Sequence, residues 1–146
     1  MGTNTGGARM VTRVYDSTLQ SVDEAEGLAV EMAREAGIHE DDLHHIGMAV
    51  RECMVNAVAH GNRYSAHKKV ELTVAVRDDS YSVRIVDQGA GFDLESLPDP
   101  LAEENLLRHS GRGIFLMKAF MDEFRVRRAQ PNGTEVLLVK NLGARH

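Results

Sequence analysis

The sequence lacks several features that would assign a protein to a class at once. Its 146 residues contain one cysteine, Cys53, which excludes an internal disulfide framework and is typical of a reducing cytosol. No apolar run approaches the roughly 20 residues that a membrane span needs. The first seven residues lack the charged-then-apolar pattern of a signal peptide. We therefore expect a cytoplasmic protein with no membrane partner.

An excess of positive charge is also missing. The 17 Lys and Arg residues against 22 Asp and Glu residues give a formal net charge of -5, whereas binding to nucleic-acid phosphates needs a basic surface. The P-loop with its lysine and the signatures of the protein-kinase fold are absent as well. The sequence thus argues against direct nucleic-acid binding. It predicts a flexible tail over residues 1–9 and a single domain over residues 10–146.

Apolar periodicity places the secondary-structure elements. A first helix begins at Ser17 or Ser21, with Glu24 completing a capping box, and ends at Gly37. Alternating patterns and turn residues predict the strands 11–15, 70–76, 81–86, 124–129 and 134–139.

A second predicted helix begins at Asp41 or Asp42 and runs to His60, and a short third helix covers 113–121. Between them, residues 93–110 lack periodicity, which is typical of a mobile lid. This order of elements predicts an α/β (α+β) two-layer sandwich, in which helices cover one face of a mainly antiparallel mixed sheet.

The second predicted helix places Glu52, Asn56 and His60 in one row, because residues four apart on a helix are neighbours. A carboxylate and a carboxamide one turn apart can orient a water or hold a hard cation through oxygen. The alternative is a solvated helix face. For His60 we favour a role in shaping the helix end.

Two glycine-rich turns bracket the predicted lid. The first is Asp87-Gln-Gly-Ala-Gly-Phe92, and the second, Gly111-Arg-Gly113, opens directly into a helix. Glycine N–H groups at a helix N-terminus form a ready anion site. Asp87 can accept a hydrogen bond from an amine such as that of adenine, or it can cap its own turn through Gly89 or Gly91. The polar row and both turns together point to nucleotide binding.

These residues resemble the GHKL superfamily of histidine-kinase-like ATPases, and within it the anti-sigma-factor serine kinases of the RsbW and SpoIIAB kind. Glu52-x-x-x-Asn56-Ala-x-x-His60-Gly looks like the N box of that family. Asp87-x-Gly-x-Gly91-Phe92 looks like its first glycine box, and Gly111-Arg-Gly-Ile114 like the start of its second. The resemblance runs from about Val11 to Val139 and implies a Bergerat-type ATP-binding fold.

The resemblance also implies roles for the N box and the first glycine box. Asn56 would coordinate Mg²⁺, and Glu52 would be the general base that accepts the proton of an attacking hydroxyl. Asp87 would bind the adenine amine, supported by Thr134. The remaining nucleotide contacts in this half of the site would come from Gly89, Gly91 and Phe92.

The second glycine box would hold the phosphates. Gly111 and Gly113, followed by Ile114, would offer backbone N–H groups to them. Arg108 or Arg112 would neutralise charge on the transferred phosphoryl group. Kinases of this family tend to place an arginine directly before the Ser-Gly of this box, whereas this chain has His109 there.

By resemblance, the protein would phosphorylate a STAS-type anti-anti-sigma protein with ATP and Mg²⁺, bind a sigma factor and form a homodimer. A nucleotide-binding module that sequesters partners without phosphotransfer is the alternative, which His109 favours. A detached ATP domain of a histidine kinase is a third reading, and a globular α/β protein without nucleotide is a fourth.

Overall fold

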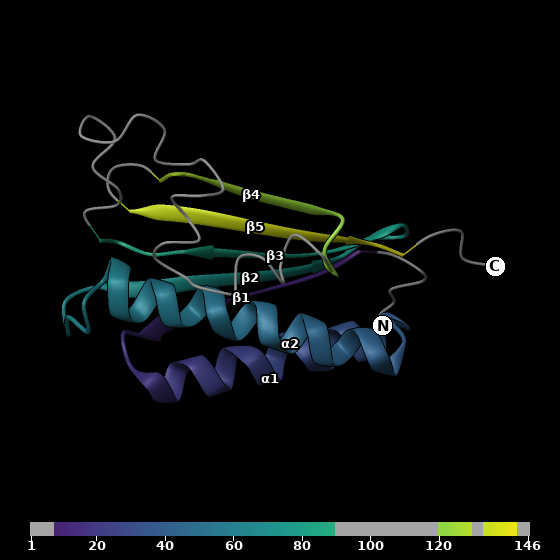
Figure 1. Cartoon of the computed structure of the whole chain (residues 1–146), viewed down its shortest axis with the longest axis horizontal. Coiled ribbons are helices and arrows are strands. Elements are labelled where there is room, and N and C mark those ends of the chain that lie inside the picture. Colours follow the sequence, from purple (N-terminus) through teal and green to yellow (C-terminus); the bar gives the residue numbers. More distant parts are fainter. Residues whose placement is uncertain (1–7, 90–119, 130–132, 143–146) are drawn as a thin grey trace.

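The computed structural model describes residues 8–89, 120–129 and 133–142. In this part of the chain, five strands form one sheet in the order β1-β2-β3-β5-β4, with antiparallel pairing throughout. The strands are β1 (Arg9–Asp16), β2 (Lys69–Val76), β3 (Ser80–Val86), β4 (Glu123–Arg128) and β5 (Thr134–Asn141). Helices α1 (Leu19–Glu35) and α2 (Glu40–Val55) cover one face of this sheet (Figure 1). The predicted two-layer α/β fold is confirmed, and β1 lies at one edge of the sheet.

The alternation within each strand decides which sheet face meets the helices, because successive side chains point to opposite sides. The inward positions of β2 and β3 are almost fully buried: Val70, Leu72, Val74, Tyr81, Val83 and Ile85. From the helices, small and medium side chains such as Ala25, Ala29 and Val50 complete the core. The buried hydroxyl of Tyr81 donates a hydrogen bond to the Ala29 carbonyl of α1 at 2.6 Å. This bond ties the sheet to the helix layer.

Both helices begin at residues other than those expected. Thr18 is the N-cap of α1, and its side chain accepts the N–H of Ser21 at 3.2 Å. Ser17 does not cap, because its hydroxyl donates to the Lys68 carbonyl instead. His39 caps α2 by accepting the N–H of Asp41 through its Nδ1 atom at 3.1 Å. The predicted acidic residues therefore lie in the first helical turn, where they interact favourably with the helix dipole.

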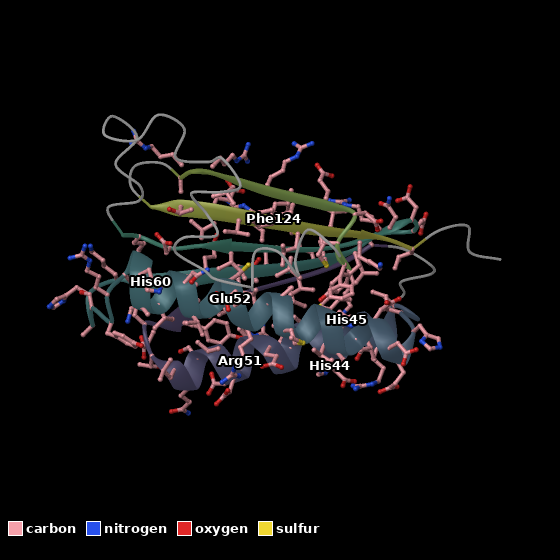
Figure 2. All side chains as sticks on the ribbon, in the orientation of Figure 1. His44, His45, Arg51, Glu52, His60 and Phe124 are labelled. Atoms are coloured by element: carbon pink, nitrogen blue, oxygen red, sulfur yellow. The ribbon has the colours of Figure 1, made fainter. Side chains whose placement is uncertain are left out.

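The chain entering β4 is held against α2 by a ring contact. The imidazole of His45 stacks on the ring of Phe120, with centroids 3.6 Å apart and planes 4° from parallel; Figure 2 labels His45 on its helix. Phe120 is helical, but the predicted lid and most of the predicted helix 113–121 lie outside the described residues. Among the residues that are described, no helix combines the length and apolar character needed to cross a membrane.

Candidate functional site

The helix that carries the polar row changes its winding in the middle of that row. The α-helical part ends at Val55, and residues Asn56–Gly61 form a π-helix. The backbone N–H of Asn62 accordingly bonds to the Ala57 carbonyl, five residues earlier, at 2.8 Å. The predicted helix does extend to His60, but its last part is wound as a π-helix. Short π-helical segments are frequent at functional sites, because they widen the helix and redirect its side chains.

Glu52 and Asn56 are half-buried and bonded to each other. The Asn56 side chain donates a hydrogen bond to the Glu52 carboxylate, so the pairing predicted from their spacing survives the change of winding. His60 is exposed and acts on Glu52 through its charge; Figure 2 shows Glu52 and His60 along the same helical segment. Because the amide nitrogen of Asn56 faces the carboxylate, its carbonyl oxygen is the atom suited to ligate a cation.

The surroundings of Glu52 favour its protonated form. Burial raises the pKa of this carboxyl above its ordinary value, while the charge of His60 and the hydrogen bond from Asn56 oppose that rise. A carboxylate with a raised pKa is a better proton acceptor near neutral pH than an ordinary glutamate. The environment of Glu52 therefore suits a general base.

The Asp87 carboxylate is buried at the end of β3, with 5% of the residue exposed. Its Oδ1 atom accepts the backbone N–H groups of Gly89 and Thr134, each at 3.0 Å. Both of these bonds, from residues that the structure describes, end on the same oxygen. The interpretation of Asp87 as the cap of its own turn is thus correct for Gly89, but that role occupies only Oδ1.

Three glycines surround Asp87 at distances that leave no space for a side chain. A Cβ atom at Gly61 would overlap the Asp87 carboxylate, and one at Gly133 would overlap the Asp87 carbonyl. At Gly89 a Cβ would overlap the Gly61 carbonyl. Gly133 also has a φ of +117°, which an L side chain rarely adopts. The end of the π-helix, the turn after β3 and the start of β5 therefore meet at this carboxylate.

Burial raises the pKa of Asp87, whereas its bonds from Gly89 and Thr134 and the charge of Lys68 act in the opposite direction. A buried carboxylate oxygen is suited to accept a donor such as the exocyclic amine of a flat heterocycle.

Five of the predicted site residues lie in the described part of the chain, where they form two groups: Glu52 with Asn56, and Asp87 with Gly89 and Thr134. The contribution of Thr134 comes from its backbone, which donates to Asp87 and accepts the Asp87 N–H at 3.0 Å. The other predicted site residues lie outside the described residues: Gly91, Phe92, Arg108, Gly111, Arg112, Gly113 and Ile114.

Sequence reasoning did not assign Asn62 to this site, and it assigned no role of their own to Gly61, the last residue of the predicted N box, or to Gly133. Their positions directly after His60 and before Thr134 were the available signal. Among the described residues, no group of three or more His, Cys, Asp or Glu side chains could hold a metal ion.

Comparison with known proteins gives one matching family and a set of similar curated relatives. The sequence model of the family described as histidine kinase-like ATPase domain matches residues 15–140. An anti-sigma F factor of Oceanobacillus iheyensis is 33% identical over 104 residues, which cover 70% of this chain and 71% of that protein. The anti-sigma F factor of Bacillus subtilis is 34% identical over 104 residues, with the same coverage of both proteins.

Two solved structures share the fold. The first contains the RsbU and RsbW domains of Rv1364c from Mycobacterium tuberculosis. Its TM-score is 0.62 at 17% identity over 90% of this chain, although only 31% of that longer chain is covered. The second is the SiaB-SiaC complex from Pseudomonas aeruginosa, with a TM-score of 0.57 at 12% identity, covering 90% of this chain and 89% of that one.

Proposed function

This chain belongs to the histidine kinase-like ATPase family, in its RsbW- and SpoIIAB-like anti-sigma branch, and we propose that it is an ATP- and Mg²⁺-dependent serine/threonine protein kinase. Its substrate in this proposal is a serine or threonine of a STAS-type anti-anti-sigma protein. Its second activity is to sequester a sigma factor. Both partners act on transcription, which places the protein in the cytoplasm.

The observation that carries the proposal is the buried Asp87 carboxylate among its three glycines. Its Oδ1 atom is fixed by two backbone N–H groups, which hold the carboxylate in one orientation, and in this proposal its second oxygen accepts the adenine amine. Gly61, Gly89 and Gly133 allow three segments to meet tightly at Asp87, because a Cβ atom at any of them would overlap neighbouring atoms of the chain.

Glu52 and Asn56 act at the other end of the nucleotide. Asn56 would hold Mg²⁺ through its carbonyl oxygen, and the ion when bound would neutralise charge on the phosphates. Glu52 accepts the proton of the attacking hydroxyl, and its bond from Asn56 keeps the carboxylate beside the metal ligand. The base and the ligand are therefore held as one unit.

The second glycine box completes the proposed site on the basis of the resemblance. Gly111, Gly113 and Ile114 would lie at the phosphates, with Arg108 or Arg112 neutralising the transferred phosphoryl group. In the first box, Gly91 and Phe92 would extend the nucleotide contacts beyond Gly89.

The names of the relatives support the choice of partners. The curated relatives are anti-sigma F factors, and one of the solved structures of this fold is a two-protein complex. We propose that the protein works as a homodimer, which presents one nucleotide site per protomer. Sedimentation equilibrium of the purified protein tests this, with a mass of twice 16.1 kDa expected.

The test of the kinase is transfer of label from γ-labelled ATP to a STAS-type protein encoded near this chain. The expected result is one labelled serine or threonine on that protein, dependent on Mg²⁺. A variant of the STAS protein without that residue serves as the control. No label on any such partner, under conditions where ATP binds, would refute the kinase.

The second candidate function is partner sequestration by a nucleotide-binding module without phosphotransfer. The observation that favours it is His109, which stands where kinases of this family tend to carry an arginine. This candidate predicts tight ATP binding and sigma-factor capture without label transfer. Substituting His109→Arg distinguishes the two, because gain of transfer in this variant alone would mean that the natural chain only sequesters.

A further inference from the structure

Asn62 is a buried carboxamide, 1% exposed, that lies directly after the π-helix. Its Nδ2 atom donates to the Ser17 hydroxyl and to the Lys69 carbonyl, both at 2.9 Å. Its Oδ1 atom accepts the backbone N–H of Gln88 at 2.8 Å. Both N–H donors and the acceptor are thus satisfied, as a buried amide requires. One side chain joins Ser17, which lies between β1 and α1, to the start of β2 and the turn that follows β3.

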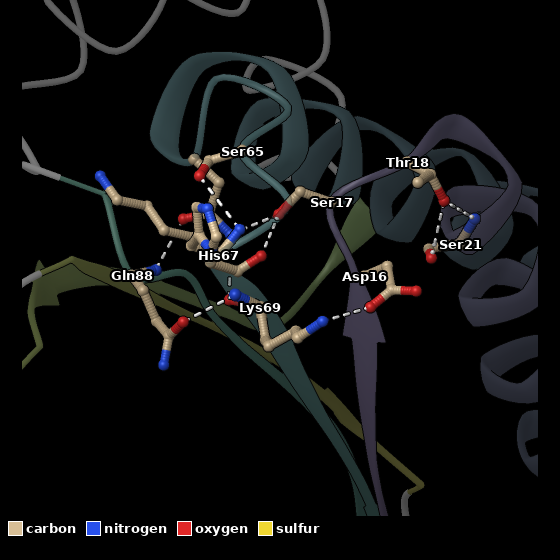
Figure 3. A network of polar contacts seen from close by, with 10 residues as sticks. Asp16, Ser17, Thr18, Ser21, Ser65, His67, Lys69 and Gln88 are labelled. Atoms are coloured by element: carbon tan, nitrogen blue, oxygen red, sulfur yellow. Dashed lines mark hydrogen bonds and ion pairs between the residues drawn. The ribbon is translucent and has the colours of Figure 1, made fainter.

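The same contacts continue around Gln88. The N–H of Lys69 donates to the Gln88 side-chain oxygen at 2.6 Å, and the Ser17 hydroxyl donates to the Lys68 carbonyl at 2.6 Å. Figure 3 shows this network, with Ser17, Lys69 and Gln88 from three separate segments converging. Gln88 is therefore held both by its backbone, through Asn62, and by its side chain.

The peptide that Asn62 holds is the one that joins Asp87 to Gln88. The residue before Asn62 touches Asp87 as well, because Gly61 lies directly against the carboxylate. Residues 61 and 62 therefore fix Asp87 relative to the end of the helical segment that carries Glu52 and Asn56. A shift of this peptide would move the Asp87 carboxylate away from its place beside Gly89 and Thr134.

We propose that Asn62 is a positioning residue that sets the Asp87 carboxylate in register with the Glu52–Asn56 end of the site. This proposal rests on the proposed ATP binding, in which Asp87 reads the base and Asn56 serves the metal-bound phosphates. Through Asn62, the base-binding and phosphate-binding halves of the proposed site stay at a fixed distance from each other before nucleotide binds. This preorganisation reduces the conformational entropy that is lost on binding and increases the selectivity for one base.

The test compares Asn62→Ala with Ser17→Ala by calorimetric titration with Mg-ATP and Mg-GTP. Both variants disrupt the same network, but only Asn62→Ala loses the bond to Gln88. We expect the affinity of Asn62→Ala for ATP to fall by about tenfold or more, which corresponds to the loss of one hydrogen bond. We also expect this variant to lose much of its preference for ATP over GTP. Ser17→Ala should keep the ATP affinity of the natural chain within about threefold and the same preference.

Two outcomes overturn the proposal: a folded Asn62→Ala variant with unchanged affinity and preference, or an equal loss in Ser17→Ala, which would mean general destabilisation. Failure of the natural chain to bind Mg-ATP would instead refute the proposed function. If Asn62→Ala does not fold, amide hydrogen exchange in the natural chain decides. The Gln88 amide must then be protected without nucleotide, and exchange there as fast as at the exposed Asp79 would overturn the proposal.

Discussion

Asp87 is buried, and its Oδ1 atom accepts the N–H groups of Gly89 and Thr134. In the proposed site, a donor on the nucleotide would bond to the second oxygen of this carboxylate. Glu52 and Asn56 differ from it, since each is half-buried and each is bonded to the other. At the scale of single residues, the proposed base-binding group is fixed by backbone N–H groups, whereas the proposed catalytic pair, Glu52 and Asn56, is coupled by a bond between side chains.

The substitution Asp87→Asn tests the base-binding role. The amide keeps an oxygen for the N–H groups of Gly89 and Thr134, but it turns a donor toward the adenine amine. We expect ATP affinity to fall by roughly 10- to 100-fold, corresponding to about 1.5–3 kcal/mol for a hydrogen bond to a charged group. Calorimetric titration measures it, with the exposed Asp79→Asn as the matched control. Unchanged affinity in Asp87→Asn would remove this residue from the site.

The raised pKa of Glu52 gives a stability prediction with a definite sign. Between the ordinary value of 4.5 and the raised folded value, the folded state binds more protons than the unfolded state. The contribution of Glu52 to the free energy of unfolding therefore falls as pH rises through this window. Denaturant unfolding at several pH values gives the free energy of unfolding of the natural chain and of Glu52→Gln, and the first value minus the second is the contribution of Glu52. If this contribution increased with pH, the effects of His60 and Asn56 on the pKa of Glu52 would outweigh that of burial.

At the scale of elements, features that depend on local patterns can be predicted from the sequence, whereas features that depend on long-range contacts cannot. The hairpin of β2 and β3 is predictable, because alternation and the turn at Asp78 and Asp79 are local. The cap of α1 is not, since Ser17 uses its hydroxyl for a carbonyl 51 residues away. The π-helix is also hidden, because its residues suit an α-helix equally well. The meeting of Gly61 with Asp87 depends on how the helix end lies over the sheet.

Leu137 and Leu138 are neighbours in β5 that sequence alone does not distinguish. Leu138 is fully buried, opposite Val83 and Phe124, while Leu137 faces the other side of the sheet and is partly exposed. We expect Leu138→Ala to lower the free energy of unfolding by about 2–5 kcal/mol, through lost burial and the cavity left behind. Leu137→Ala is the matched control and should cost clearly less in the same denaturant titration. Equal costs would contradict the register of β5.

The contact between the π-helix end and the turn after β3 gives a second prediction at this scale. In Gly61→Ala, the new methyl group meets the Asp87 carboxylate, so ATP binding should be lost or weakened by about tenfold or more. Gly27→Ala is the control, because nothing lies within 4 Å of its added Cβ. That variant should bind ATP normally and gain roughly 0.5–1 kcal/mol of stability, since alanine favours a helix interior. Full ATP binding by a folded Gly61→Ala variant would contradict the contact.

At the scale of the whole molecule, the fold brings three distant parts of the chain together where the π-helix ends beside strands β3 and β5. Asp87 follows β3, Thr134 begins β5, and Gly61 ends the segment that continues α2. Binding at this junction links three elements, so nucleotide should stabilise the entire fold. At 100 times its dissociation constant, Mg-ATP should add about 2.7 kcal/mol to the free energy of unfolding. Thermal melting with and without Mg-ATP measures this, and an unchanged Tm would contradict a nucleotide site.

The most direct test of the kinase uses one variant and two measurements. Glu52→Gln keeps the shape of the side chain and can still accept a bond from Asn56, but it cannot take a proton. We predict that this variant binds Mg-ATP like the natural chain, while single-turnover transfer to the STAS-type partner falls by about 10²- to 10⁴-fold. Transfer at the natural rate with Glu52→Gln would contradict the assignment of Glu52 as the general base, and with it the account of how this site works.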